Sequence, residues 1–216
     1  MKLMKKCACI ICGKYIQDKR MYLLGKIGVC NKCFANFKRT GDMTFEGKGS
    51  ISMVLSPYLY KGKLCEAVRK FKFSGQWAYG EVFAKLMCKE LASYDWISDF
   101  DLVLPVPLHE IRVRERGYNQ SEILARGFAD GFNIPLCSDA LFRIRQTKRQ
   151  SSLAGIDRIK NVEDAFCASG NIVVGKRIIL IDDICTMGET LKACADALKR
   201  AGADEIIGIT LCKAEV

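Results

Sequence analysis

The sequence has little histidine, little proline and no long apolar stretch. Of its 216 residues, one is histidine and four are proline. A helix that crosses a bilayer needs about 20 successive apolar residues, and no run approaches that length, so we expect no membrane span. The basic residues 1–6 are followed by cysteines instead of the apolar core of a secretory signal. We therefore expect a cytoplasmic protein.

Common nucleotide-binding motifs are also missing from the most informative run, residues 178–191. The run has neither the Gly-Lys-Ser/Thr of a P-loop nor the Gly-x-Gly-x-x-Gly of a dinucleotide fold. It consists instead of four apolar residues, two carboxylates (Asp182 and Asp183) and a short turn that leads into a helical pattern. This order predicts a buried strand, a turn and a helix N-terminus in direct succession.

The turn in this run is expected to bind an anion. The first turn of a helix has unpaired N–H groups and a dipole that favours phosphate, and Gly188 lets a ligand approach the backbone closely. The two carboxylates precede the turn, where they can meet sugar hydroxyls or a hydrated Mg²⁺. The alternative is an ordinary strand-to-helix connection whose aspartates are solvated.

Three segments resemble known protein families. Residues 178–191 resemble the ribose-5-phosphate loop of type I phosphoribosyltransferases, which use phosphoribosyl pyrophosphate (PRPP). Residues 105–109, Arg112 and residues 116–120 resemble the Pro-Val-Pro and Arg-Gly-Tyr-Asn-Gln motifs of the ComF family, which is associated with DNA uptake in natural competence. The family's following segment is similar to residues 145–150, Leu153, Arg158, Asn161 and Phe166.

The resemblance implies a role for each part of the site. Asp182 and Asp183 would engage the ribose hydroxyls, directly or through Mg²⁺-bound water. The 5-phosphate would lie against Thr186, Met187, Gly188, Glu189 and Thr190. The pyrophosphate would lie against Val106, Pro107, Arg112 and Arg116. A guanidinium suits that task because it binds two oxygens at once. Arg112, Arg114 and Arg116 alternate, so all three would face one way in an extended segment.

Neither the acceptor of the phosphoribosyl group nor a general base follows from the sequence. His109, the only histidine, adjoins the expected pyrophosphate site, and both a general acid and a structural loop residue remain open. Cys185 lies inside the expected phosphate loop. A helix N-terminus would lower its pKa, whereas a small buried thiol is the simpler interpretation.

The cysteines near the N-terminus are spaced as metal ligands. Cys9 and Cys12 form one Cys-x2-Cys pair, Cys30 and Cys33 form a second, and 17 residues separate the pairs. Two such pairs complete a tetrahedron of thiolates around Zn²⁺, and this leaves no open position for catalysis. We therefore expect a structural zinc ribbon, with Cys7 either a substitute for Cys9 or a spare thiol.

Positive charge is concentrated in the first part of the chain. Residues 1–63 contain 13 Lys/Arg and 3 Asp/Glu, whereas residues 64–216 contain 21 of each. A basic module beside a neutral domain indicates a polyanionic partner. Nucleic acid and anionic lipid both fit this charge, and the resemblance favours single-stranded DNA, together with a DNA-uptake helicase. The alternative is that the lysines serve solubility alone.

The alternation of apolar runs and helical patterns after residue 101 predicts an α/β fold with a mostly parallel sheet flanked by helices. The resemblance makes this fold type I phosphoribosyltransferase-like. We expect a basic four-cysteine zinc-ribbon module over residues 1–45 and the α/β domain over residues 51–216, with residues 39–50 as a linker rich in turn formers. Strands are expected at 51–60, 102–106 and 206–211, and helices at 64–73, 77–93, 119–131 and 189–200.

Residues 145–161 are basic and contain few apolar side chains. They are similar in position and charge to the mobile hood loop of type I transferases, which would shield the substrate from water. A plain connection and a basic strip for nucleic acid remain open. Three functions are therefore compatible with the sequence: a Mg²⁺-dependent phosphoribosyltransferase, a PRPP- or nucleotide-sensing factor that binds single-stranded DNA, and a zinc-stabilised interaction protein.

Overall fold

The fold is built on a mostly parallel sheet. The computed structural model describes residues 7–16, 22–24, 26–144 and 165–215. Six strands form the main sheet in the order β5-β6-β12-β11-β8, with β7 also paired to β12. Their bounds are Thr44–Glu46 (β5), Met53–Leu55 (β6), Tyr58–Leu59 (β7), Leu102–Pro105 (β8), Ile178–Cys185 (β11) and Ile206–Lys213 (β12). All pairings among them are parallel except that of β5 with β6, which confirms the predicted sheet.

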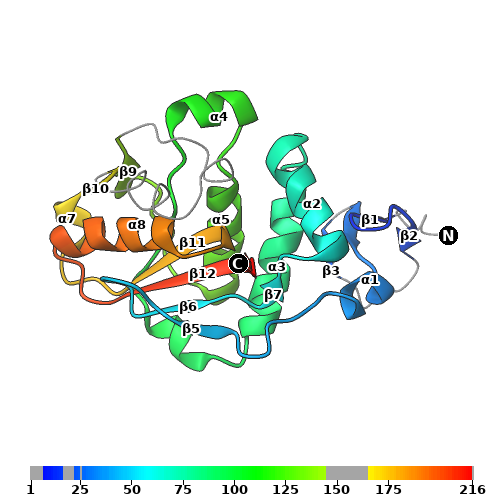
Figure 1. Ribbon diagram of the computed structural model, residues 1–216, viewed down its shortest axis with the longest axis horizontal. Helices are drawn as coiled ribbons and strands as arrows, with labels where there is room; N and C mark the ends of the chain where they lie inside the picture. Colours follow the sequence, from blue (N-terminus) through cyan, green and yellow to red (C-terminus); the bar gives the residue numbers. More distant parts are fainter. Residues whose placement is uncertain (1–6, 17–21, 25, 145–164, 216) are drawn as a thin grey trace.

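Helices cover both faces of this sheet (Figure 1). The long helices are α2 (Gly62–Phe73), α3 (Ala78–Leu91), α5 (Gln120–Phe132) and α8 (Glu189–Arg200). Ile179 and Ile181 of β11 belong to the apolar core formed with α2, α3 and α5, whereas Ile178 and Leu180 belong to the core formed with α8. Alternate side chains of a strand point to opposite faces, so the unbroken apolar run of β11 follows from burial on both sides.

Shorter elements complete the α/β fold. They are η1 (Asp95–Asp99), α4 (Glu110–Arg116), α7 (Gly170–Val173) and the antiparallel pair β9 (Leu141–Arg143) and β10 (Phe166–Ala168). Over the described residues, every helix is too short or too polar to traverse a bilayer. The basic segment 145–161, with its predicted hood loop, lies outside the described residues.

Helices α3 and α5 approach each other closely along a seam of small residues. Gly80, Ala84 and Cys88 recur at every fourth position of α3, and Gly127 and Gly131 do so on α5. A methyl group built on Gly127 would lie 2.7 Å from Ala84 Cβ, and one on Gly131 would lie 2.5 Å from Cys88 Sγ. Residues four apart form a ridge along a helix, so this seam sets the position of α5 against α3.

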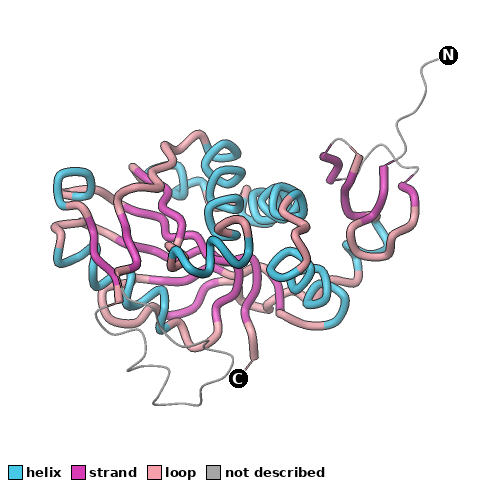
Figure 2. The backbone as a smooth tube through the Cα atoms, turned by 90° about the horizontal axis from the view of Figure 1, so that it is seen from above, coloured by secondary structure: helices cyan, strands magenta, loops and turns pink. Residues whose placement is uncertain are grey.

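The N-terminal segment forms a separate small sheet at one end of the molecule (Figure 2). Its strands are β1 (Cys7–Cys9), β2 (Tyr15–Ile16), β3 (Tyr22–Leu24) and β4 (Ile27–Val29), in the order β2-β1-β4-β3, followed by α1 (Asn31–Ala35). Its buried residues Val29, Cys33 and Phe37 join the apolar core that contains α3. The small sheet is therefore packed against the α/β fold, while the expected division into residues 1–45 and 51–216 stays a prediction.

An ion pair strengthens the junction between the small sheet and the α/β fold. The Arg39 guanidinium donates to both carboxylate oxygens of Glu90 on α3, at 3.0 and 3.1 Å. The Tyr58 hydroxyl also donates to Glu90 Oε1, at 3.1 Å. Arg39 in turn stacks over the Phe34 ring at 4.9 Å. A bidentate pair of this kind fixes geometry better than a single contact does.

The linker predicted for residues 39–50 is wrong in one respect. Residues 44–46 form β5, an edge strand that pairs antiparallel with β6. The turn formers that follow belong to the β5–β6 hairpin, and this hairpin is docked on α8 because the Ser50 N–H donates to Asp196 Oδ1 at 3.0 Å. The strand predicted over 51–60 is divided into β6 and β7, since Pro57 between them has no N–H for the ladder.

Candidate functional site

Two carboxylates lie in the second half of β11, which extends through Cys185 and so continues beyond the apolar run 178–181 that predicted the strand. Asp183 is buried, with 2% of its surface exposed, and its Oδ1 lies 2.9 Å from the Lys72 ammonium of α2. Its other oxygen, Oδ2, is buried and has no hydrogen-bond partner among the described residues. Asp182 is half-buried and pairs in register with Thr210 of β12. The ends of parallel strands are where ligands bind in sheets of this kind.

Asp182 is held by a chain of hydrogen bonds that starts in the loop after β8. The Asn119 amide donates to the Val106 carbonyl at 3.1 Å, and Asn119 Oδ1 accepts from the Ser121 N–H at 3.1 Å. The Ser121 hydroxyl then donates to Asp182 Oδ1 at 2.7 Å. The bond from the Ser121 N–H shows that Asn119 caps α5, and the amide of the same side chain also fixes the loop.

The environment of Asp182 opposes its ionisation. Burial and the neighbouring Asp183 carboxylate raise the pKa of Asp182 to about 6, although Lys72 and the bond from Ser121 act to lower it. Two adjacent, desolvated carboxylates repel each other. A bound cation or bound hydrogen-bond donors would therefore stabilise the site. Sugar hydroxyls and a hydrated divalent cation both meet that need.

The predicted phosphate loop joins β11 to α8. Thr186, Met187 and Gly188 form a bend, and Glu189 and Thr190 begin α8. Gly188 occupies the N-cap position with φ of 79°, a left-handed conformation that favours glycine, and glycine has no side chain with which to cap the helix. No side chain therefore caps the start of α8, and helix starts of this kind commonly bind anions.

One side chain in this loop is already engaged. Glu189 Oε1 lies 3.0 Å from the Lys48 ammonium, which extends from the β5–β6 hairpin. Lys48 therefore adds a positive charge beside the loop, from the segment whose turn formers predicted a linker. The bound carboxylate of Glu189 also means that its contribution to anion binding is confined to its backbone.

The three alternating arginines are helical, so the extended arrangement considered for them is wrong. They lie on α4, which ends in the left-handed Gly117. Arg112 and Arg116 are four residues apart on one helix face and line a cavity of about 200 Å³ together with Lys72, Phe73, Gly75 and Glu115. Arg114 points elsewhere: its side chain is 82% exposed and pairs with Glu110. Val106 and Pro107 precede this helix. The Val106 N–H donates to the carbonyl of Ile181 at 2.9 Å, and Ile181 directly precedes the acid pair.

Arg116 has a defined environment. Its guanidinium donates to Gln120 Oε1 and lies over the Phe73 ring at 5.2 Å. Burial lowers the pKa of Arg116, while the charges of Asp183 and Asp182 act to raise it. A partly desolvated cation close to the acid pair is suited to an anionic ligand that also contacts those acids.

The structure favours structural roles for His109 and Cys185, whose roles the sequence left open. His109 caps α4, where its Nδ1 accepts a hydrogen bond from the Ile111 N–H at 3.3 Å, which favours the structural interpretation. It also lines a second, larger cavity of about 1000 Å³ near Pro107 and Phe142. Cys185 is buried, and burial raises its pKa, which favours the interpretation as a small buried thiol.

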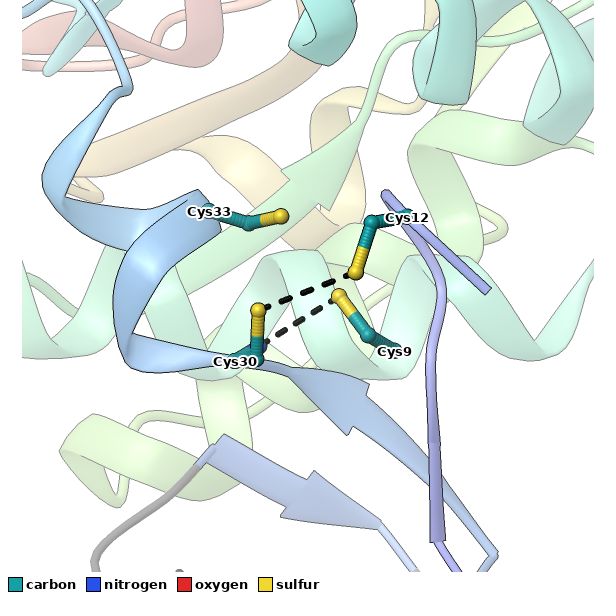
Figure 3. A group of neighbouring side chains, drawn as sticks. All are labelled: Cys9, Cys12, Cys30 and Cys33. Carbon is teal, nitrogen blue, oxygen red and sulfur yellow. Dashed lines mark hydrogen bonds between the residues drawn. The ribbon is translucent and has the colours of Figure 1, made fainter. Parts of the chain in front are cut away.

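The four predicted zinc ligands converge on one point (Figure 3). The Sγ atoms of Cys9, Cys12, Cys30 and Cys33 all lie within 4.8 Å of one another. Sulfurs around a tetrahedral zinc are about 3.8 Å apart, as Zn–S bonds of about 2.3 Å require, and Cys12 Sγ and Cys30 Sγ are 3.8 Å apart. The four thiols can hold a metal ion. Cys7 is buried outside this group.

Sequence reasoning missed three residues of the site. Ser121 follows the Arg-Gly-Tyr-Asn-Gln motif directly, but a serine in the first turn of a helix is too common to be singled out. Lys72 and Lys48 approach from segments more than 100 residues away from the acid pair along the chain. Their roles depend on tertiary packing, and no local pattern indicates them.

Comparison with known proteins gives consistent matches. Residues 79–215 match the phosphoribosyl transferase domain. Competence protein F of Haemophilus influenzae is 30% identical over 64% of this chain and 63% of its own length. Competence protein ComFC of Streptococcus pneumoniae is 26% identical over 95% of this chain and 99% of its own length. Among solved structures, glutamine PRPP amidotransferase from B. subtilis has a TM-score of 0.42 and 25% identity, covering 60% of this chain and 25% of that one. The chain thus spans less than two thirds of the Haemophilus protein and a quarter of the amidotransferase.

Proposed function

The chain belongs to the phosphoribosyl transferase domain family and to its ComF group, and from this premise we propose that it binds PRPP with Mg²⁺ in DNA uptake. The observation that carries the proposal is that Asp182 and Asp183, near the end of β11, are connected by the short bend of residues 186–188 to a helix start that no side chain caps. One short connection therefore presents acids for a ribose and a helix start for its 5-phosphate.

Each part of PRPP has a matching surface in this proposal. The 5-phosphate lies against the backbone of residues 186–190, and the ribose hydroxyls lie against the acid pair. The pyrophosphate lies against Arg112 and Arg116, beside the loop that contains Val106 and Pro107. Positive charge develops on the sugar as pyrophosphate departs, so carboxylates near the ribose and cations near the leaving group would both stabilise that transition state.

The acid pair fits the divalent cation that accompanies PRPP. Asp183 Oδ2 is buried without a partner among the described residues, and a buried carboxylate oxygen left in that state costs about 1–3 kcal/mol. Mg²⁺ bound through one or two carboxylates and several waters would satisfy it. When bound, the cation would neutralise pyrophosphate oxygens, while Ser121 keeps Asp182 oriented.

Calorimetric titration with PRPP and Mg²⁺ tests the proposal. The wild-type protein should bind PRPP, and the double variant Asp182→Asn/Asp183→Asn should not, because it loses both charges. Pyrophosphate release from PRPP over a panel of nucleobases, with and without single-stranded DNA, then separates a transferase from a sensor. An unchanged PRPP affinity in the double variant would remove the site assignment.

A second candidate function is a non-catalytic, PRPP-responsive factor that binds single-stranded DNA, with a DNA-uptake helicase as a further partner. The basic composition of residues 1–63, with 13 Lys/Arg against 3 Asp/Glu, favours it. In addition, Tyr15 is 66% exposed on the small sheet, and exposed aromatic rings stack on bases. DNA affinity should then fall steeply with salt, and an affinity independent of salt would contradict this candidate.

The four-cysteine group is proposed to hold a structural Zn²⁺. Four thiolates satisfy the metal completely, and a small sheet with so few buried residues depends on such a ligand for part of its folding free energy. The metal would then support the DNA-binding surface without taking part in chemistry.

A further inference from the structure

Lys72 lies between the acid pair and the arginine cavity and contacts both. Its ammonium is 2.9 Å from Asp183 Oδ1, with only 19% of the lysine side chain and 3% of the aspartate side chain exposed. The same lysine lines the 200 Å³ cavity that contains Arg112 and Arg116. A flexible lysine in that position can direct its charge to either side.

The position of Lys72 is fixed by the Arg-Gly-Tyr-Asn-Gln motif. The Tyr118 hydroxyl donates to the carbonyl of Phe71, and the two rings stack with centroids 5.8 Å apart and an interplanar angle of 28°. Phe71 is fully buried and directly precedes Lys72. The end of α2 is therefore anchored, so that only the side chain of Lys72 is free to exchange partners.

We infer that Lys72 is an exchangeable counterion that couples cation binding at the acid pair to diphosphate binding in the arginine cavity. This inference rests on the proposed function and adds a residue to it. Without ligand, the ammonium neutralises Asp183. A divalent cation would compete for the same carboxylate, and the displaced ammonium would turn toward the cavity as a third cation for a diphosphate.

The unsatisfied oxygen of Asp183 supports this exchange. Lys72 contacts only Oδ1 of Asp183 and leaves Oδ2 without a partner among the described residues. The ion pair therefore satisfies only one of the two oxygens of this buried carboxylate. A cation with its own shell of water would satisfy both oxygens. The cavity, in turn, has an excess of positive charge. Arg112 and Arg116 lie on one helix face, and among the described residues that line the cavity only Glu115 is a carboxylate.

The test is a pair of binding measurements on Lys72→Met, which keeps the length of the side chain and removes its charge. Mn²⁺ alone, followed by water-proton relaxation, should bind about tenfold more tightly than to wild type, because its competitor is gone. Inorganic pyrophosphate with Mg²⁺, followed by calorimetry, should bind about tenfold more weakly; both changes are within the usual range of coupling between sites. The expected result is that this one variant binds Mn²⁺ more tightly and pyrophosphate more weakly than the wild type.

The matched control is Lys70→Met, because Lys70 is an exposed cation on the same helix and should change neither affinity. Lys72→Met that weakens both ligands would show a merely structural lysine and overturn the inference, as would a variant that changes neither. Those outcomes leave the proposed function intact as long as the wild type binds PRPP. Wild-type protein that binds neither PRPP nor pyrophosphate would instead contradict the proposed function itself.

Discussion

The hydroxyl of Ser121 lies 2.7 Å from Asp182 Oδ1, although 61 residues separate them along the chain. This bond ties the first turn of α5 to the carboxyl end of β11. Asn119 and Ser121 together connect the Val106 carbonyl to Asp182, so hydrogen bonds join the expected pyrophosphate loop to the expected ribose-binding acids. The Arg-Gly-Tyr-Asn-Gln motif and the loop with the acid pair are therefore connected at Asp182.

Removal of the Ser121 hydroxyl should weaken PRPP binding more than it weakens folding. A hydrogen bond to a charged group contributes about 1.5–3 kcal/mol, so Ser121→Ala is expected to lower PRPP affinity by roughly tenfold as Asp182 loses its orientation. Calorimetry with Mg²⁺ measures this change. Thr40→Val is the control, because it removes another buried hydroxyl bond, to the Ser56 carbonyl, that involves neither acid. Equal losses of affinity in the two variants would contradict the prediction.

Purified protein should contain one zinc per chain, and strong chelation should expose the N-terminal segment to protease. Cys12→Ser or Cys33→Ser should reduce the zinc content, since three thiolates form a weaker site than four. Elemental analysis and limited proteolysis measure both effects. Cys7→Ser provides the comparison, because Cys7 is buried near the group without belonging to it. A zinc content that depends on Cys7 and not on Cys9 would show that the assigned ligand set is wrong.

The junction between the small sheet and α3 should depend on Glu90. Glu90 accepts from Arg39 and Tyr58, and its side chain is only 13% exposed. A double-mutant cycle with Arg39→Ala and Glu90→Gln should give a coupling free energy of about 1 kcal/mol, because Arg39 is itself 42% exposed and solvent screens the pair. Denaturant unfolding measures it. A coupling near zero would show that the apolar contacts alone hold the junction.

Asp196 should make the stability of the hairpin dependent on pH. Burial alone would raise the pKa of Asp196, but the bonds from Lys192 and Ser50 outweigh it and hold that pKa below its usual value. A carboxylate with a lowered pKa stabilises the fold above its unfolded pKa and loses that effect as the pH falls through the folded pKa. Asp196→Asn should therefore lower the free energy of unfolding by about 1 kcal/mol at pH 7.

The loss from Asp196→Asn should fade below about pH 4, where the unfolded aspartate begins to bind protons. Denaturant titrations of both proteins at several pH values measure the difference. A loss that stays constant down to about pH 3, below the ordinary pKa of an aspartate, would contradict an effect of charge. The variant should also leave the zinc content unchanged, since Asp196 lies on α8 and not on the small sheet.

The strands and helices that surround the site were predictable from the sequence because their patterns are local. The apolar run before Asp182 predicted β11, and the helical spacing before Gly202 predicted α8. The hairpin at β5 was missed because an edge strand of three residues between turn formers resembles a linker. The helix α4 was missed as well, since alternating charges at 112, 114 and 116 suit an extended segment as readily as a helix.

The candidate site was predictable only in part. The acids and the phosphate loop follow one another in the chain, so one motif indicates them together. Lys72 and Ser121 reach Asp183 and Asp182 through the packing of α2 and α5, which depends on contacts between distant segments. Single-sequence patterns describe periodicity within a segment, and they contain no signal for which lysine or serine a fold will bring to a carboxylate.

The seam of small residues between α3 and α5 affects the acid pair from a distance, because it sets the position of the helix that carries Ser121. Gly127 lies almost two turns along α5 from Ser121, and it faces Ala84 with no room for even one carbon atom. A side chain at that position would pivot α5 away from α3 and withdraw the serine from the carboxylate it orients. If the acid pair binds the proposed ligand, its affinity would thus be sensitive to crowding at a helix crossing well removed from the ligand itself.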